Sequence, residues 1–280
     1  MVGYLPPSSD DEGAPRPRRP RTTPVRPGGP GRVERFAHEG LVVETEELPG
    51  ERRGPAPVFL LVHGIGMGRT VFGALADILR RHGTVLTLDQ PGYGASPEPE
   101  PTASMAWTAD VIAAWLRSHG RGPVVAVGHS MGSQVVAELA VRHPEAVSRL
   151  VLVAPTVDRH ARRLGVQLHR LARDLVGESP RVLVVGGREY LRAGPHLRRK
   201  LGAMLEHRPE LLYPRIQAPT LVLRGSRDPV SPLPWCLEVA AAIPEARLEQ
   251  VEGHGHEAMI RDPEQAAALI LRFVADATHR

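Results

Sequence analysis

Short apolar runs alternate with stretches of helical periodicity along most of the chain. Four short runs, apolar except for Thr87, have the length of buried strands: 58–62, 85–88, 124–127 and 150–154. Apolar residues at helical spacing between these runs predict three helices: 69–82, 104–119 and 134–143. Strands and helices that alternate in this way predict a parallel sheet with right-handed crossovers.

The pattern changes on both sides of this region. Residues 33–48 predict a β-hairpin with its turn at 38–40. Residues 156–216 have no strand-like alternation and are rich in arginine, so we expect an inserted helical cap there. Alternation then resumes, with two further strands and two further helices expected at 220–223, 232–243, 246–251 and 263–275.

Composition separates the first 32 residues from the rest. This segment is rich in Pro, Gly and Arg and has few large apolar residues, which predicts a disordered tail. Its six arginines and three acids give it a net charge of +3 out of the total of +4. Residues 33–280 are therefore nearly neutral. We expect them to form one domain. Because no nucleic-acid-binding motif accompanies the basic tail, we expect no nucleic-acid partner.

The remaining composition bears on compartment. The chain has a single cysteine, Cys236, which excludes an intramolecular disulfide and suits a reducing compartment. No apolar run approaches the length of a membrane span, and the N-terminus has no hydrophobic core of a signal peptide. We therefore expect a cytoplasmic protein without membrane contacts.

Residues 128–132, Gly-His-Ser-Met-Gly, join an expected strand to an expected helix. A tight turn of this kind strains its central residue and leaves no room for Cβ atoms two positions to either side, which accounts for Gly128 and Gly132. The turn raises the Ser130 hydroxyl at the carboxyl edge of the sheet, with a helix N-terminus behind it. In this context the G-x-S-x-G pattern predicts a nucleophilic serine.

Through this turn and the order of elements around it, the chain from Val33 to its C-terminus resembles the α/β-hydrolase family. The resemblance implies an α/β fold with a mostly parallel central sheet, flanking helices and an inserted helical cap. It also implies the order serine, acid, histidine along the chain, with all three residues in loops at the carboxyl ends of strands.

The family pattern selects an acid and a histidine. Asp228 follows the first strand after the expected cap, within a G-x-x-D pattern, although an aspartate before proline can also be a turn residue. Asp158 is the alternative, because some family members carry the acid after the preceding strand. His256 ends a G-x-G-H pattern, and Pro263 opens the last helix seven residues later. His254 occupies the variable position and is expected to be a solvated loop residue.

The resemblance also implies two backbone donors for an oxyanion, the N–H groups of Ile65 and Met131. Ile65 follows His63-Gly64, which matches the H-G-x loop of the family, and Met131 directly follows the serine. His63 and His129 are expected to brace their loops rather than to transfer protons. Asp89 belongs to a loop that is usually structural.

These residues predict a serine hydrolase that acts on an ester-like or activated C–C bond of a small molecule. Ser130 would be the nucleophile, His256 the general base and acid, and Asp228 its orienting group. Hydrolysis would proceed through an acyl-enzyme, for which we expect no cofactor. We also expect no metal, because the thirteen histidines do not cluster at metal-ligand spacing.

Four alternatives stay open: a thioesterase for a carrier-bound acyl chain, a cofactor-free perhydrolase, a lyase or cyclase on the same fold, and a binding protein on a hydrolase scaffold. The arginine-rich cap allows selection of an anionic substrate or a carrier domain, although the arginine bias of the whole chain favours solvated helix faces. The substrate-binding residues and the oligomeric state are not predicted.

Overall fold

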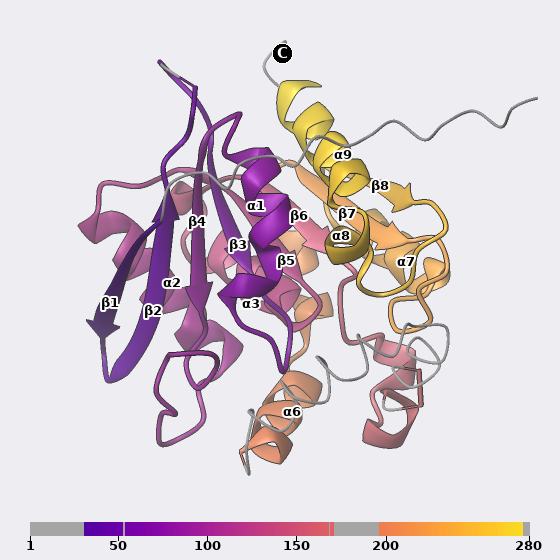
Figure 1. Cartoon of the computed structure of the whole chain (residues 1–280). Helices are drawn as coiled ribbons and strands as arrows, with labels where there is room; N and C mark the ends of the chain where they lie inside the picture. The colour runs from indigo at the N-terminus through magenta and orange to yellow at the C-terminus, as the bar shows by residue number, and fades with distance from the viewer. Residues whose placement is uncertain (1–30, 53, 168, 171–195, 277–280) are drawn as a thin grey trace, which may run out of the picture.

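The computed structural model describes residues 31–52, 54–167, 169–170 and 196–276 (Figure 1). An eight-stranded sheet runs through them in the order β1-β2-β4-β3-β5-β6-β7-β8. Its strands are β1 Arg32–His38, β2 Leu41–Leu48, β3 Val58–Val62, β4 Thr84–Asp89, β5 Val124–His129, β6 Val147–Val153, β7 Thr220–Gly225 and β8 Ala246–Val251. Strands β3 to β8 pair in parallel, and only the β1–β2 and β2–β4 pairs are antiparallel. The mostly parallel sheet predicted from the sequence is confirmed.

The predicted hairpin is formed by β1 and β2. Its turn consists of Glu39 and Gly40, whose φ angles are 48° and 80°. Two positive φ angles give a turn that matches the right-handed twist of the strands, and glycine adopts such an angle at little cost. β2 then pairs with β4, with Glu44 opposite Asp89, so the hairpin extends one side of the parallel sheet.

Helices cover both faces of the sheet (Figure 1). Helices α2, α3 and α7 bury residues such as Ile112, Val135 and Trp235 against one face, and α1, α8 and α9 bury Leu75 and Ile270 against the other. The α-helices are α1 Gly73–Leu79, α2 Met105–Ser118, α3 Met131–Arg142, α6 Leu197–Glu206, α7 Leu233–Ala242, α8 Ala258–Arg261 and α9 Pro263–Asp276. The apolar strands between these two layers form the core, as their continuous hydrophobic runs predicted.

Two predicted helices begin differently. The helix expected at 69–82 is split into a 3-10 turn, η1 Arg69–Phe72, and the shorter α1, with Gly73 at the junction. Glycine inside a predicted helix lowers its stability, and a 3-10 turn is a frequent way to open a helix. The helix expected at 134–143 starts earlier, at Met131, because it begins directly after the tight turn.

The segment between β6 and β7, residues 156–216, is named the cap segment below. Its described residues contain the 3-10 turns η3 Arg159–Ala161, η4 Pro209–Leu211 and η5 Tyr213–Arg215 together with α6, and they contain no strand. Residues 168 and 171–195 of this segment, and residues 1–30 of the expected tail, lie outside the described residues. Within the part of the chain that is described, no helix has both the length and the apolar character needed to cross a bilayer.

Candidate active site

Ser130 lies in the turn between β5 and α3, where its backbone adopts φ 53° and ψ −117°. This conformation is sparsely populated for a residue with a side chain. The neighbouring glycines are fixed by close packing: a Cβ on Gly128 would lie 2.3 Å from the carbonyl oxygen of Gly132, and a Cβ on Gly132 would lie 2.2 Å from that of Val62. The Ser130 N–H donates to the carbonyl oxygen of Val153 at 2.9 Å, which ties the turn to β6. The tight turn has the form that the motif predicted.

Three side chains from loops after β5, β7 and β8 meet at the carboxyl edge of the sheet. Ser130 Oγ lies 3.0 Å from His256 Nε2, and His256 Nδ1 lies 2.9 Å from Asp228 Oδ2. The other carboxylate oxygen, Asp228 Oδ1, accepts hydrogen bonds from the N–H groups of Val230 (2.7 Å) and Ser231 (3.0 Å). The structure therefore brings the predicted serine, histidine and aspartate into one hydrogen-bonded series.

The charge of Asp228 sets the tautomer of His256. Burial by itself would raise the pKa of Asp228, but the charge of His256 and the hydrogen bonds from His256, Ser231 and Val230 together lower this pKa. The group is therefore ionised at neutral pH and can only accept hydrogen bonds. His256 must then carry its proton on Nδ1, and Nε2 is the acceptor that faces the Ser130 hydroxyl. This arrangement suits proton transfer from serine to histidine.

Asp158 and His254, the alternative acid and histidine, form contacts away from Ser130. Asp158 Oδ1 accepts from the His160 N–H at 2.9 Å, and its Oδ2 pairs with Arg170 at 2.8 Å, so this carboxylate caps η3 and anchors part of the cap segment. His254 Nε2 lies 3.5 Å from Asp262 Oδ2, with 30% of its side chain exposed. The position beside the serine hydroxyl belongs to His256 instead, and the position beside the His256 ring belongs to Asp228.

The two expected backbone donors flank the serine. Met131 is the first residue of α3, so its N–H is one of the donors that have no partner within the helix. Ile65 lies in the turn after β3. A Cβ on the adjacent Gly64 would come within 3.1 Å of Ser130 Cβ, which means that this loop passes closely over the serine.

His63 braces the loop of Ile65, as predicted. Its Nδ1–H donates to the carbonyl oxygen of Gly64 at 2.8 Å, and its Nε2 accepts from the N–H of Gln90 at 3.1 Å. The Gln90 side-chain amide donates in turn to the carbonyl oxygen of His63 at 2.6 Å. Burial lowers the pKa of His63, so the ring is neutral and holds one tautomer that joins the β3 and β4 loops.

Asp89 is structural, as the resemblance implied. Its carboxylate accepts from the N–H of Arg69 at 2.6 Å and from that of Ala95 at 3.0 Å, and it forms an ion pair with the Arg69 side chain at 2.5 Å. These contacts close the loop after β4 on itself and on η1.

Sequence reasoning missed Lys200, which lies on α6 with only 3% of its side chain exposed. Its Nζ lies 2.6 Å from Glu98 Oε2, donates to the carbonyl oxygen of Gly92 and sits 4.3 Å from the ring centroid of Tyr93. The Tyr93 hydroxyl donates to the sulfur of Met131 at 3.5 Å. A series of contacts thus joins the cap segment to the first residue of α3. The available signal was that this is the only lysine in an arginine-rich chain.

Two residues of α3 that belong to no sequence motif, Gln134 and Glu138, hold the cap segment to this helix. Gln134 is fully buried one turn after the serine, and its Nε2 donates to the carbonyl oxygens of Thr156 (3.0 Å) and Met204 (3.1 Å). Glu138, one turn further, pairs with His207 at 2.8 Å. Residues four apart share a helix face, so Ser130, which directly precedes α3, and Gln134 and Glu138 within it lie on the same side of the helix.

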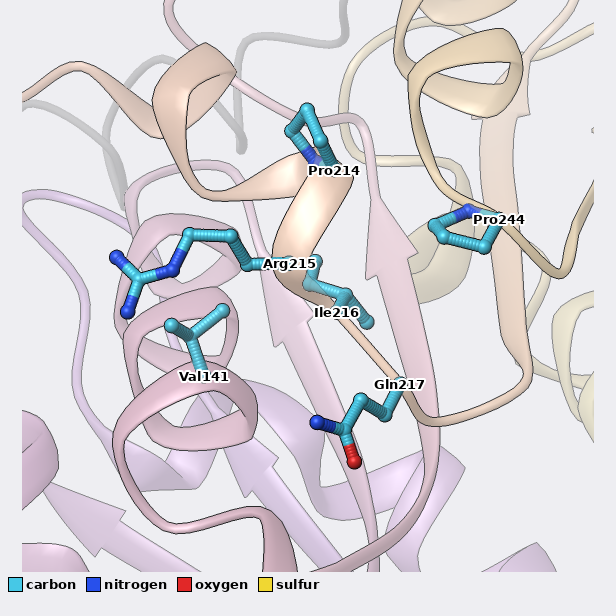
Figure 2. Close-up of a pocket in the computed structure, with 6 residues that line it drawn as sticks. All are labelled: Val141, Pro214, Arg215, Ile216, Gln217 and Pro244. Carbon is cyan, nitrogen blue, oxygen red and sulfur yellow. The ribbon is translucent and has the colours of Figure 1, made fainter.

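The described residues also form a cavity outside the candidate active site. A cavity of about 470 Å³ opens at the amino ends of β7 and β8, whereas the serine lies after the carboxyl end of β5. It is lined by Val141, Pro214, Arg215, Ile216, Gln217 and Pro244 (Figure 2). Open α/β sheets bind ligands at the carboxyl ends of their strands, so this cavity is not the candidate substrate site. Among the described residues, no group of three or more His, Cys, Asp or Glu side chains is arranged to hold a metal ion.

Comparison with known proteins places this geometry in context. The model of the Alpha/beta hydrolase family matches residues 59–269, which is more than half of the chain. The pimeloyl-[acyl-carrier protein] methyl ester esterase of Chromobacterium violaceum is 28% identical over 233 residues, which cover 74% of this chain and 89% of the esterase.

Solved structures show the same fold. A thermophilic esterase from Thermogutta terrifontis superposes with a TM-score of 0.73 at 24% identity, over 88% of this chain and 98% of that one. The enol-lactonase of Burkholderia xenovorans LB400 superposes with a TM-score of 0.71 at 22% identity, over 86% and 100% of the two chains. The predicted α/β fold class is therefore confirmed.

Proposed function

Because this chain belongs to the alpha/beta hydrolase family, we propose that it is a serine hydrolase that cleaves an ester-like bond of a small molecule through an acyl-enzyme. The observation that carries the proposal is the buried series of hydrogen bonds from Ser130 Oγ through His256 to Asp228. A serine hydroxyl is a weak nucleophile at neutral pH, and a base within hydrogen-bond reach makes it reactive.

In the proposed reaction, Ser130 Oγ attacks the carbonyl carbon while its proton passes to His256 Nε2. The resulting oxyanion accepts hydrogen bonds from the N–H groups of Ile65 and Met131. Collapse of this intermediate breaks the bond to the leaving group, which takes the proton from His256. Water then attacks the acyl-enzyme with His256 again as the base, and the acid product and the free serine are released. Asp228 stabilises the imidazolium in both halves of the reaction.

The test is labelling of the full chain with a fluorophosphonate probe and peptide mapping, together with turnover of p-nitrophenyl esters of increasing acyl length. We expect the label on Ser130, ester turnover, and loss of both in Ser130→Ala and His256→Ala. His254→Ala is the matched control and should keep both activities. Absence of label and turnover in the folded wild-type protein would refute the proposal. Label without turnover of any ester would favour the lyase or cyclase alternative.

A second candidate is an esterase or thioesterase that acts on a carrier-bound acyl chain. It is supported by the substrate in the name of the Chromobacterium relative and by exposed arginines of the cap segment, among them Arg198 and Arg208. Arginine pairs well with phosphate, which a phosphopantetheine arm carries. If this candidate is correct, Arg198→Ala and Arg208→Ala should raise KM for an acyl-carrier substrate and leave KM for p-nitrophenyl esters unchanged. Equal KM changes for both substrates would contradict it.

A further inference from the structure

His129 directly precedes Ser130, and its imidazole is fully buried. Its Nε2 lies 3.0 Å from the backbone carbonyl oxygen of His256, and the centroids of the two rings are 5.1 Å apart. On another side, a Cβ on Gly64 would lie 3.2 Å from His129 Nδ1, so the loop of Ile65 packs against this ring. One side chain therefore contacts both the segment that carries the proposed base and the loop that carries a proposed oxyanion donor.

The contacts of His129 determine its protonation. A carbonyl oxygen only accepts hydrogen bonds, so the proton of the neutral ring is on Nε2 and is donated to His256. His129 Nδ1 is buried and has no hydrogen-bond partner among the described residues. Burial, followed by repulsion from the charge of His256, lowers the pKa of His129 to about 3, despite the opposing effects of its hydrogen bond and of Asp228. The ring is therefore a neutral, single donor at neutral pH.

Neutrality matters because of what happens to His256 during the proposed reaction. When His256 takes the proton of Ser130, it becomes an imidazolium ion. A cationic side chain at position 129 would oppose that charge at close range in a region of low dielectric. A neutral N–H donor holds the backbone of His256 without that cost. An apolar side chain would fill the same space but would leave the His256 carbonyl oxygen without this donor.

We propose that His129 is a positioning residue for the base: it fixes His256 through the carbonyl oxygen of that residue and supports the loop of Ile65 from the same ring. The proposal rests on the proposed function, in which His256 accepts the proton of Ser130. His129 acts through these residues and contacts no reacting atom. It should therefore affect the rate of acylation more than substrate binding.

The test compares two replacements of similar length, His129→Met and His129→Gln. The glutamine Nε2–H is as many bonds from Cβ as the histidine Nε2–H, so this variant keeps a neutral donor, whereas methionine has none. Misplacing a catalytic group by about 1 Å can cost about 100-fold in rate. We expect His129→Met to lower kcat and the rate of fluorophosphonate labelling about 10- to 100-fold with KM within about twofold. His129→Gln should restore kcat to within about threefold of wild type.

A purely structural role would give a different pattern. Both variants would then lose thermal stability, and kcat of the folded fraction would not depend on whether residue 129 can donate. Wild-type kcat in folded His129→Met, or an equal loss of kcat in His129→Gln, would overturn the proposal.

Two nuclear magnetic resonance measurements do not depend on ester turnover, so they separate this proposal from the proposed function. In the wild-type protein, ¹⁵N shifts should show His129 protonated at Nε2 only, and protonation at Nδ1 alone would overturn the proposal even if no variant folds. The low-field proton of the His256–Asp228 hydrogen bond should be displaced or broadened in His129→Met and retained in His129→Gln. An unchanged resonance in both variants would also overturn it.

Discussion

Replacing Ser130 by glycine should give a more stable protein than replacing it by alanine. Both variants lose the hydrogen bond between Ser130 Oγ and His256, so that loss cancels in the comparison. They differ in the Cβ atom, which alanine keeps in a backbone conformation of φ 53° and ψ −117°. Such a conformation costs about 1–3 kcal/mol for a residue with a Cβ. Glycine avoids this cost but loses about 0.5–1 kcal/mol of chain entropy on folding.

The difference predicts that Ser130→Gly is more stable than Ser130→Ala by about 0–2.5 kcal/mol, or about 1.25 kcal/mol at the midpoints of the two ranges. For a domain of this size, the midpoint corresponds to a Tm higher by about 2.5–5 °C, measured by calorimetry at one pH. Ala268→Gly is the matched control, because Ala268 is an exposed residue inside α9, where glycine should cost about 1 kcal/mol. Ala268→Gly should melt below wild type. If Ser130→Gly likewise melts below Ser130→Ala, the backbone of Ser130 is not strained and the prediction is wrong.

Three further outcomes are expected. Gly132→Ala should destabilise the fold by about 3 kcal/mol or more because its Cβ would meet backbone, whereas Gly202→Ala in α6, with open space around its Cβ, should not lower Tm. Asp228→Asn should lower kcat by about 10⁴-fold by removing the charge that sets the His256 tautomer, and equal loss in Asp158→Asn would argue for the other acid. The pKa of His129 is about 3 in the folded state and about 6.5 in the unfolded chain. Between about pH 3 and pH 6.5 the unfolded chain therefore binds more protons than the folded protein. Stability should fall as pH drops from about 6.5 towards 3, and a Tm profile of His129→Gln that is equally steep would contradict this assignment.

The sheet and its turn could be predicted because both are encoded over short stretches of sequence. β5 begins with a continuous apolar run, Val124 to Val127, and the glycines two positions to either side of Ser130 follow from the space available in one turn. The order of serine, acid and histidine came from the resemblance to a family, and the hydrogen-bond distances now support Asp228 and His256 over their alternatives.

Other features depend on residues that are far apart in the sequence. The apolar runs do not reveal that β4 lies between β2 and β3. Lys200 contacts Gly92 across 108 positions, and Gln134 contacts Met204 across 70. Hydrophobic periodicity reports which side of an element is buried and not which distant segment covers it, so these contacts required the structure.

Helix α3 begins directly after Ser130 and also contacts the cap segment, so it affects whether the cap segment can be replaced by one from another protein. Variants with a new substrate range are often sought by transplanting one inserted segment onto an otherwise constant fold, and the cap segment is the natural unit for such a transplant. Here Gln134 and Glu138 extend the helix of the serine into contacts with Met204 and His207. A foreign segment needs a carbonyl oxygen for the side-chain amide of Gln134 and a basic side chain for the carboxylate of Glu138. Without them these two buried groups would be unpaired, which costs about 1–3 kcal/mol for each hydrogen-bonding group. Chimaeras of this protein should therefore take residues 134 and 138 from the protein that supplies the new cap segment, so that both sides of these contacts are exchanged together.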